Sequence, residues 1–578
     1  MVSLTDSQSV VAGLHYSDSQ LVIAGPGTGK TTTAIELIKS IDSQLDFNEE
    51  RSVLFLSFSR AAIQAAFDSM ESEIEDLDLY VKHQTLDSLA TSQLAEFGLL
   101  GEGSSFDFDS RIRKAIDLLK NHGEELLEDI CHIIVDEAQD ILGIRQQFLA
   151  EVISHLPDDC GISVFGDPYQ TLYQFQVQKK AINEKKTDQP QSLVEWEVLV
   201  NRIFKNRDYS TTILQDQFRA QGLLAKKVFK DLEYVRETES QLTASSHLRS
   251  LVSDLNSFGL DELKALLPRW SGSVSLLTRT NADAIQIYEA MIEQEIPSTI
   301  VLRKELRPAL PSWLGKWALE ASGPSFNSRA LRDFIASDET SMAEADALGI
   351  QFAFDDDVSW DEIRQAAQFY SPQPKIEAVS GSVLVTTVHQ SKGLEFDNVL
   401  VHNPEQYVSD VDASSSALEV LFVALSRGKK QISSFQESMG KVSKKEGTWF
   451  LPHPNSRFTP KAICIDPRDI RIDLKVGDST SQERLAAYAS GDKLHFEVIS
   501  SSFDVPIYRC FLDGLPVATT TEDFGRRLVK IARVKDIRWP KLSSVPVVDL
   551  ESSFSKDTNQ IAPFLIPLPL GFSEIKFK

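Results

Sequence analysis

Cysteine is scarce in this chain of 578 residues: there are four, at positions 131, 160, 464 and 510, and none stands in a Cys-x-x-Cys pair. Such spacing gives no disulfide framework, which favours a reducing compartment. Long apolar runs are also missing, since none approaches the roughly 20 residues that would cross a bilayer. The first residues, Met1 to Asp6, lack a basic segment followed by an apolar one. We therefore expect a cytoplasmic protein without a membrane segment.

Basic residues are the second deficit. The chain has 59 lysines and arginines against 84 aspartates and glutamates, which gives a formal net charge of −25. This balance argues against a protein that coats nucleic acid through its whole surface. Any contact with DNA must therefore be local, in a groove lined by hydrogen-bond donors and stacking aromatic side chains.

The distribution of apolar residues predicts an α/β fold. Short apolar runs at residues 21–23, 53–56, 133–135 and 162–165 suit buried strands of a parallel sheet, and a second series follows at 274–277, 383–386 and 399–401. Because the length exceeds what one core supports, we expect several domains. These are an α/β domain at 1–205 with a small, mostly helical insertion at about 91–128, a second at 206–440 with an insertion at about 297–380, and a β-rich module at 441–578.

A phosphate-binding loop is the strongest chemical signal. The segment departs from the pattern G-x-x-x-x-G-K-[ST] only in its first residue, and it consists of Ala24, Gly25, Pro26, Gly27, Thr28, Gly29, Lys30 and Thr31. The glycines allow backbone N–H groups to form an anion nest, and the following helix adds its positive end. Lys30 would reach the β and γ phosphates, and Thr31 would bind Mg²⁺. The sequence thus predicts ATP and Mg²⁺ as cofactors.

A pair of carboxylates follows another predicted strand. Asp136 and Glu137 stand directly after the apolar run at 133–135, at the edge where open α/β sheets bind ligands. Asp136 would hold Mg²⁺, and Glu137 would polarise the attacking water. An acidic turn by itself is more often a solvated loop, but the phosphate loop makes the catalytic interpretation the better one.

Seven further motifs carry a family resemblance. They read TDSQ at 5–8, SFSRAA at 57–62, TLDSLA at 85–90, FGDPYQ at 165–170, LQDQFR at 214–219, TTVHQSKGLEF at 386–396 and VALSR at 423–427. In this order the chain, from about residue 4 to 430, resembles the UvrD/Rep family of superfamily 1 (SF1A) DNA helicases. The resemblance implies two RecA-like motor domains that close on ATP and open after its hydrolysis.

The resemblance also implies roles for individual residues. Its nucleotide contacts correspond to Gln8 at the adenine edge, Phe218 stacked on adenine, Glu395 at the ribose, Gln170 at the γ-phosphate, and the arginine fingers Arg219 and Arg427. Its DNA contacts correspond to Ser57, Phe58, Ser59, Arg60, Thr85, Tyr173, Phe175, Thr387 and His389. Taken singly, the aromatic residues among these are as easily explained as core side chains, and the arginines as surface cations.

Four positions depart from the family pattern. Asp87 replaces a usual His, Phe175 a common Trp, and Gln176 an Arg. Thr32 stands where the family often has an Arg after the phosphate loop, so we keep Thr32 as a nucleotide contact with reduced capacity. These changes weaken one stacking contact and remove one phosphate contact.

The resemblance implies an ATP-dependent translocase or helicase on single-stranded or forked duplex DNA, moving 3′ to 5′, in repair, recombination or phage defence. The short insertions make translocation better supported than strand separation. One alternative is a DNA-activated ATPase subunit or switch that works with a nuclease and does not unwind DNA. Another is an unrelated phosphate-loop enzyme such as a kinase, against which the two arginine motifs argue.

Overall fold

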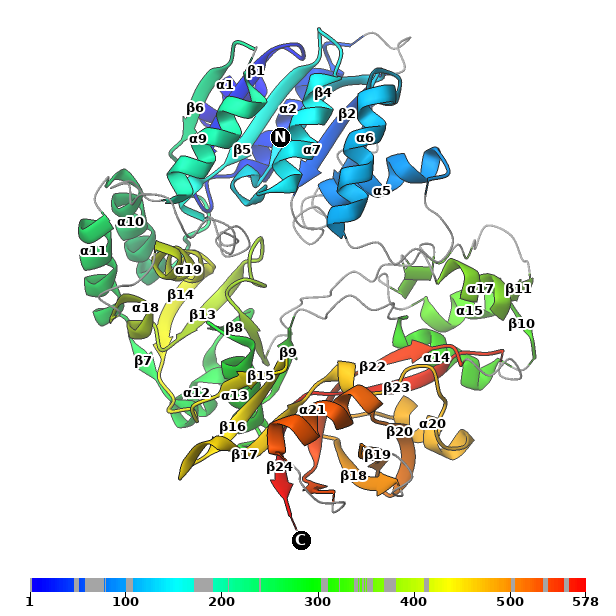
Figure 1. Cartoon of the computed structure of the whole chain (residues 1–578). Coiled ribbons are helices and arrows are strands. Elements are labelled where there is room, and N and C mark those ends of the chain that lie inside the picture. The colour runs from blue at the N-terminus through cyan, green and yellow to red at the C-terminus, as the bar shows by residue number, and fades with distance from the viewer. Residues whose placement is uncertain are drawn as a thin grey trace. The chain divides into compact units, whose positions relative to one another are not determined.

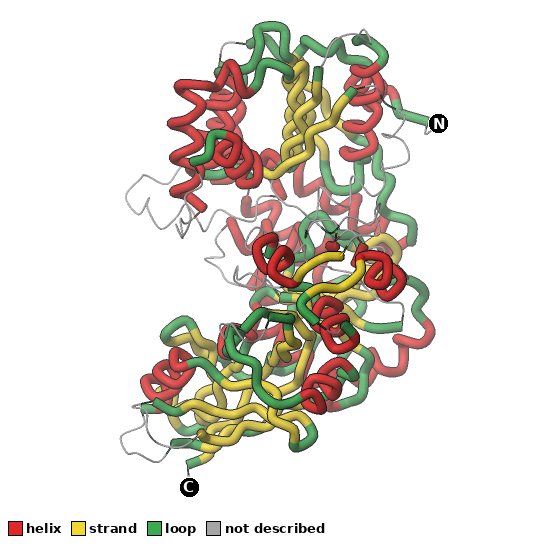
Figure 2. The backbone as a smooth tube through the Cα atoms, turned by 90° about the vertical axis from the view of Figure 1, so that its right-hand side faces the viewer, coloured by secondary structure: helices red, strands yellow, loops and turns green. Residues whose placement is uncertain are grey.

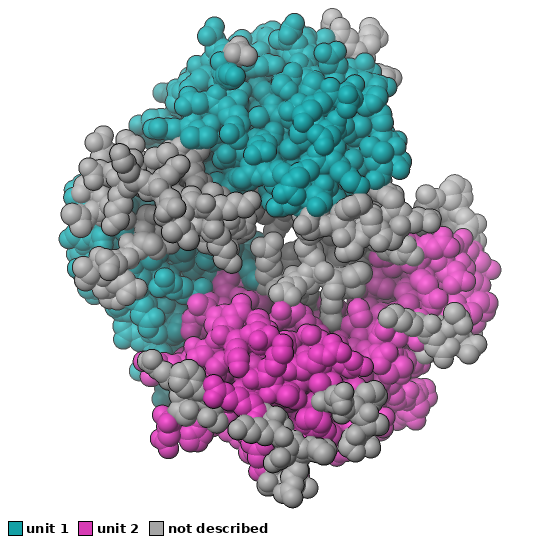
Figure 3. Space-filling model, in the orientation of Figure 1, with its two compact units in different colours: residues 1–279, 378–381, 388–437 teal, residues 280–377, 382–387, 438–578 magenta. Residues whose placement is uncertain are grey.

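The computed structural model describes residues 3–45, 51–57, 77, 79–99, 108–170, 191–205, 207–238, 241–302, 310–321, 323–336, 341–342, 344–345, 348, 350, 357–367, 381–409, 415–499, 505–533, 539–555 and 561–577. The chain divides into two compact units, coloured separately in Figure 3. Unit 1 comprises residues 1–279, 378–381 and 388–437, and unit 2 comprises residues 280–377, 382–387 and 438–578.

The first sheet of unit 1 contains six parallel strands in the order β3-β2-β4-β5-β1-β6. The four inner strands are buried on both faces because helices cover each side, as Figures 1 and 2 show. The strands are β1 (Ser19–Ala24), β2 (Ser52–Ser57), β3 (Tyr80–Thr85), β4 (Ile130–Asp136), β5 (Gly161–Gly166) and β6 (Ser210–Leu214). The helices are α1 (Asp6–Ala12), α2 (Lys30–Asp42), α5 (Leu86–Glu96), α6 (Phe108–Leu126), α7 (Ile144–Ser154) and α9 (Gln191–Ile203).

A second group of parallel strands in unit 1 has the order β7-β14-β13-β8. These strands are β7 (Ser257–Phe258), β8 (Val274–Thr278), β13 (Phe396–His402) and β14 (Gly428–Phe435). Their helices are α10 (Leu223–Glu237), α11 (Gln241–Ser253), α12 (Leu260–Leu266), α18 (Glu405–Ser409) and α19 (Ser415–Leu425). Short 3₁₀ turns η1 (Ala138–Asp140), η2 (Pro168–Gln170) and η3 (Leu267–Arg269) complete the unit. Unit 1 therefore contains the first predicted parallel arrangement and two of the three strand runs predicted for the second, at 274–277 and 399–401, whereas the run at 383–386 belongs to unit 2.

Unit 2 combines a helical insertion with a β-rich module. Its first part contains α13 (Asn281–Glu293), the parallel pair β9 (Ser298–Val301) and β12 (Val383–Thr387), α14 (Ser312–Glu320), β10 (Ser325–Asn327), α15 (Ser328–Ile335), β11 (Asp357–Ser359) and α17 (Trp360–Ala366). Aromatic residues of the insertion form their own core, which includes Trp313, Trp317, Phe326 and Trp360.

The C-terminal module contains two antiparallel sheets in the orders β15-β16-β17-β24-β21 and β20-β19-β18-β22-β23. The strands are β15 (Ser443–Lys445), β16 (Thr448–His453), β17 (Ser456–Ile465), β18 (Lys493–Ile499), β19 (Ile507–Leu512), β20 (Leu515–Thr519), β21 (Lys541–Leu542), β22 (Val545–Ser553), β23 (Phe564–Pro569) and β24 (Gly571–Lys576). Two helices, α20 (Ser479–Ala486) and α21 (Glu522–Ala532), and the turn η4 (Pro467–Asp469) accompany them. The predicted fold class is confirmed, and the predicted boundaries 1–205, 206–440 and 441–578 stay predictions.

Two observations bear on the first expectations. All four cysteines are buried free thiols, and burial raises the pKa of Cys131 to about 11. Among the described helices, none is both long enough and apolar enough to span a bilayer.

Candidate nucleotide-hydrolysis site

The phosphate loop joins the end of β1 to the start of α2. Gly27 and Gly29 adopt left-handed backbone conformations, with φ of 75° and 79°, which other residues adopt only with strain. Thr28 Oγ1 donates to the Gly25 carbonyl at 2.9 Å, and Lys30 Nζ donates to the Ala24 carbonyl at 3.4 Å. The loop is therefore held in a closed turn from which α2 begins at Lys30, while Thr31 and Thr32 follow half-buried in its first turn.

Glu137 faces the loop lysine. Its backbone is left-handed, with φ of 50°, an uncommon conformation for a residue with a side chain and one often found at functional sites. Lys30 Nζ lies 3.3 Å from Glu137 Oε1, and the Gln139 amide donates to the other carboxylate oxygen. Burial alone would raise the pKa of Glu137, but Lys30 and Lys392 outweigh it and lower that pKa to about 2. Glu137 is therefore held ionised beside the loop.

Asp136 ends β4 at the same sheet edge as two predicted DNA contacts. In the strand register, Ser57 pairs with Thr85 on one side and with Asp136 on the other. Burial and the charge of Glu137 raise the pKa of Asp136 to about 7. A divalent cation would relieve this repulsion, so Asp136 and the Thr31 hydroxyl fit a Mg²⁺ ion that completes its ligands with water and phosphate oxygens.

The two predicted adenine contacts meet at Gly29. A Cβ atom added to Gly29 would lie 2.5 Å from Gln8 Nε2 and 3.6 Å from Phe218 Cδ2. Gln8 Nε2 donates to the Thr28 carbonyl at 3.2 Å, and Phe218 N donates to the Gly27 carbonyl at 2.8 Å. The Phe218 side chain keeps about half of its surface exposed, so its ring is available to stack.

Gln170 lies between the two strand groups of unit 1. Its Nε2 donates to Asp167 Oδ2 at 2.8 Å, and its Oε1 accepts from Arg427 Nη2 at 3.2 Å. Lys392 Nζ donates to the Gln170 backbone carbonyl at 2.7 Å and forms an ion pair with Asp140. The predicted γ-phosphate sensor is thus bonded to the predicted finger Arg427.

The two arginines differ in their surroundings. Arg219 donates through Nε to Glu395 Oε1 at 2.9 Å and through Nη1 to the Ser426 carbonyl at 2.8 Å. Lys429 Nζ also lies 3.2 Å from Glu395 Oε2. Arg427 is buried, and burial together with the charge of Arg219 lowers its pKa to about 9, so it remains charged at neutral pH. Glu395, which the resemblance places at the ribose, is here the partner of these cations.

Sequence reasoning assigned no role to three residues of this cluster. Gln217 Nε2 donates to the Pro26 carbonyl at 2.5 Å, and its Oε1 accepts from the Ala220 N–H at 3.2 Å. Lys392 and Asp140 form the ion pair described above. The available signals were positional: Gln217 precedes Phe218, Lys392 lies inside the 386–396 motif, and Asp140 follows Glu137 by three residues. Nothing in the sequence gives their partners.

The predicted DNA contacts are only partly within the described residues. Ser57 and Thr85 are buried, and Thr85 Oγ1 caps α5 by accepting from Ser88 N at 3.1 Å. Thr387 is buried in unit 2, whereas His389 is half-buried in unit 1. The remaining contacts lie outside the described residues, as does Gln176; these are Phe58, Ser59, Arg60, Tyr173 and Phe175.

Asp87, which replaces a family histidine, has a structural partner. Arg145 of α7 donates to both of its carboxylate oxygens, at 3.0 and 2.7 Å. A bidentate pair of this kind is directional. It ties the first turn of α5 to the first turn of α7.

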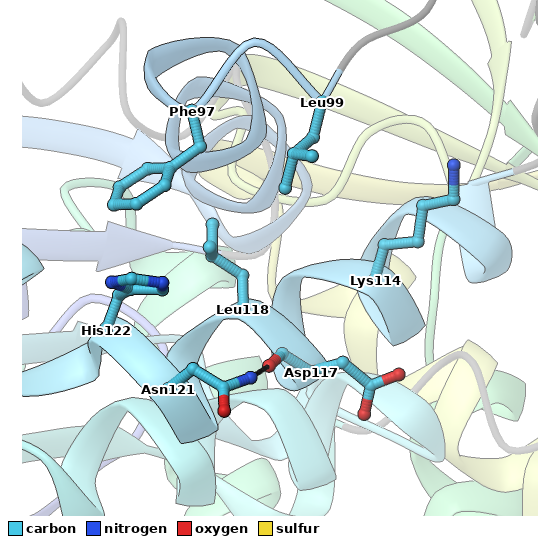
Figure 4. Close-up of a pocket in the computed structure, with 7 residues that line it drawn as sticks. All are labelled: Phe97, Leu99, Lys114, Asp117, Leu118, Asn121 and His122. Carbon is cyan, nitrogen blue, oxygen red and sulfur yellow. Dashed lines mark hydrogen bonds between the residues drawn. The ribbon is translucent and has the colours of Figure 1, made fainter.

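A pocket of about 460 Å³ lies between the end of α5 and α6 (Figure 4). Its aromatic side is formed by Phe97 and His122, whose ring centroids are 4.7 Å apart. The other lining residues are Leu99, Lys114, Asp117, Leu118 and Asn121. None of these belongs to the nucleotide cluster, so the pocket is a separate feature of unit 1.

Two family models match the chain where the cluster is built. An AAA domain model matches residues 7–176, and a UvrD-like helicase C-terminal domain model matches residues 382–432. The two matches together cover less than half of the chain, and both support a superfamily 1 helicase-type assignment. A search of curated protein sequences gives no match.

Two solved structures are among those similar to the chain. Pif1 helicase from Candida albicans is 14% identical, with 75% of this chain and 95% of that chain covered at a TM-score of 0.37. A Dbp5 variant from S. cerevisiae, bound to a Gle1 variant and IP6, is 12% identical, with 72% and 79% covered at a TM-score of 0.34. Residues of both matched segments meet in the cluster described above, where Gln170 of the first segment accepts a hydrogen bond from Arg427 of the second.

Proposed function

We propose that the protein hydrolyses ATP with Mg²⁺ and that single-stranded DNA stimulates this hydrolysis, which drives translocation along the strand. The observation that carries the proposal is the grouping of four charged side chains in unit 1. Lys30 and Glu137 come from the first sheet, Arg219 lies beside Gly27 in the loop after β6, and Arg427 of the second strand group interacts electrostatically with Glu137. A phosphate loop with its lysine, a residue that positions water and arginine fingers recur in enzymes that transfer a phosphoryl group to water.

Each cation of the site has an internal partner. Lys30 pairs with Glu137, Arg219 with Glu395, and Arg427 with the Gln170 amide. A triphosphate would take Lys30 and the arginines as partners for its own charge, because charge-assisted hydrogen bonds to phosphate are strong. Glu137 would then be released from Lys30 to orient the attacking water and accept its proton.

Thr31 and Asp136 would hold the Mg²⁺ ion, which neutralises charge on the phosphate oxygens when bound. The protein's contribution is the position of these two side chains, at the start of α2 and the end of β4. Gln170, fixed between Asp167 and Arg427, would report the presence of the γ-phosphate to the second strand group.

The finer assignment includes 3′ to 5′ movement on single-stranded or forked duplex DNA, in repair, recombination or phage defence. Its support is the order of the motifs and the UvrD-like match at residues 382–432. The four buried thiols are compatible with the cytoplasm as the compartment. The second candidate is a DNA-activated ATPase subunit of a nuclease complex, which the chain's net charge of −25 favours.

The deciding experiment measures ATP turnover by the purified chain with Mg²⁺, with and without single-stranded DNA. We expect single-stranded DNA to stimulate ATP turnover by the wild type, and we expect Lys30→Ala to lack this stimulated turnover. ATP turnover that is equal with and without single-stranded DNA would contradict the proposal of a DNA-stimulated motor. Forked duplexes with 3′ or 5′ tails then separate an autonomous helicase from an ATPase subunit, which would release no strand.

A further inference from the structure

A third arginine, which none of the motifs includes, lies against the phosphate loop. Arg236 is in the last turn of α10, a helix that packs on β14 and α11 of the second strand group. Its side chain is 16% exposed. The apolar face of the same helix is buried through Val228, Leu232 and Val235, so the backbone that carries Arg236 is firmly packed.

The guanidinium of Arg236 takes the space that a side chain at position 25 would need. A Cβ atom added to Gly25 would lie 2.6 Å from Arg236 Nη1, 3.0 Å from Cζ and 3.5 Å from Nε, and those are its three nearest atoms. Gly25 is not among the glycines with positive φ, unlike Gly27 and Gly29. The backbone at Gly25 would therefore accept alanine, and the obstacle is Arg236 itself.

The same guanidinium faces a fully buried carboxylate. Arg236 Nε lies 3.5 Å from Asp167 Oδ1, and the Asp167 side chain has 0% exposure. A buried carboxylate requires compensation by positive charge or hydrogen bonds. Asp167 in turn accepts from Gln170 Nε2, and Gln170 accepts from Arg427. Arg236 thus stands at one end of a chain of contacts that reaches the second finger.

We propose that Arg236 is a positioning residue of the nucleotide site, which sets the phosphate loop at Gly25 and, through Asp167, the Gln170 side chain for triphosphate binding. This inference rests on the proposed ATPase function. Arg236 belongs to the second strand group and the loop to the first sheet, so the contact makes the shape of the loop depend on the position of α10. Nothing in the inference places Arg236 on the reacting atoms.

The test compares the ATP KM, kcat and the affinity for a fluorescent ATP analogue among variants. For Arg236→Ala we expect KM to rise about tenfold with kcat changed less than about threefold, because a charge-assisted contact that orders the loop is lost. Arg236→Lys keeps the charge without the planar group, so its KM should be intermediate. Lys230→Ala, an exposed cation on the same helix, is the matched control and should resemble the wild type.

A second-site experiment separates positioning from a general loss of charge. Gly25→Ala should raise the KM in the wild-type background, because its Cβ displaces the guanidinium. In the Arg236→Ala background the same change should add nothing, whereas Gly27→Ala, at a left-handed position, should remain harmful in both. If Arg236→Ala does not fold, the Gly25→Ala comparison is made in Arg236→Lys, where we expect the same suppression.

Two results would overturn the inference, and they are distinguishable from failure of the proposed function. A wild type that hydrolyses ATP alongside an Arg236→Ala variant of equal KM refutes the role of Arg236 alone. Additive effects of Gly25→Ala and Arg236→Ala do the same. A wild type that binds no ATP analogue refutes the proposed function and this inference together.

Discussion

The nucleotide cluster of unit 1 and the buried polar side chains of unit 2 make different kinds of contact. In unit 1, charged side chains from separate elements pair with each other, and some of these pairs reach solvent, as with Lys30 and Glu137 at 12% and 16% exposure. In unit 2, buried side chains mostly bond to backbone groups. The Gln482 amide exchanges two hydrogen bonds with the backbone of Leu565, and Ser552 accepts from Gly315 N while donating to the Pro311 carbonyl.

The difference teaches which region can accept a ligand. An ion pair that reaches solvent can exchange one partner for a phosphate, because the phosphate supplies a new charge-assisted hydrogen bond. A buried side chain that satisfies backbone groups cannot leave without stranding them. Unit 2 also has a buried ion pair, Arg527 with Asp469, but both residues belong to the C-terminal module. The contrast therefore predicts catalytic effects from changes in unit 1 and stability effects from changes in unit 2.

The largest effect is expected from Lys30→Ala. Loss of the loop lysine should lower ATP turnover by more than about 100-fold, because a phosphate contact realised in the transition state is removed. Circular dichroism should be unchanged, since Lys30 begins α2 and is not part of the apolar core that the helix buries. Lys39→Ala, at the other end of α2 in a pair with Glu36, is the control. Retained ATP turnover in Lys30→Ala would contradict the expectation that changes in the unit 1 cluster affect catalysis.

Arg427→Lys should have the next largest effect. We expect kcat to fall about 100-fold in single-turnover assays with KM changed little, because an ammonium cannot reproduce the planar donor set that reaches Gln170. Arg471→Lys, on an exposed arginine of unit 2, serves as control. Equal kcat in the two variants would mean that Arg427 is only a structural cation.

Ser552→Ala should lower stability without touching catalysis. It leaves Gly315 N and the Pro311 carbonyl without the Ser552 hydroxyl, which should cost about 2 kcal/mol of unfolding free energy in urea titrations. The neighbouring, less buried Ser553→Ala is the control. A loss of ATP turnover in folded Ser552→Ala would show that the two regions are not separable in this way.

The smallest effect concerns a buried acid in unit 2. Glu289 of α13 accepts from Phe572 N at 2.7 Å. Burial and the nearby Glu293, against the weaker effects of that hydrogen bond and of Lys493, raise the pKa of Glu289 to about 7 from 4.5. Below pH 4.5 the carboxyl is protonated in both the folded and the unfolded protein, so it does not lower the free energy of unfolding. Between pH 4.5 and 7 only the folded protein keeps the proton, and the free energy of unfolding falls as the pH rises. Above pH 7 this loss of stability is complete.

Glu289→Gln should therefore stabilise unit 2 by about 1 kcal/mol at pH 8 and by nothing at pH 4. Urea titrations at the two pH values measure this, with Glu293→Gln as the comparison. A stabilisation that is equal at both pH values would mean that the Glu289 carboxyl does not titrate as its burial implies.

Much of the first sheet was predictable because its inner strands are continuous apolar runs. The run at 133–135 lies within β4, and that at 162–165 within β5. The strands β3, with the sequence YVKHQT, and β14, with GKKQISSF, were missed. Polar residues dominate both, as an exposed edge position allows for β3, so apolar patterning gives no signal there.

The chemistry of the phosphate loop was determined by the sequence itself. Its glycines, lysine and threonine lie within eight consecutive residues. A turn with left-handed glycines between a strand and a helix brings them together without any contact to a distant segment. Lys30 and Thr31 needed no distant partner to be recognised.

Only the tertiary structure decided which groups those residues face. Arg219 and Glu395 are 176 positions apart, and Arg427 and Gln170 are 257 apart. Arg236 lies in none of the sequence motifs, yet its guanidinium lies against Gly25. Such pairs depend on the strand order and on how helices pack across the sheets, because these place distant residues at one edge, and no local pattern encodes that placement.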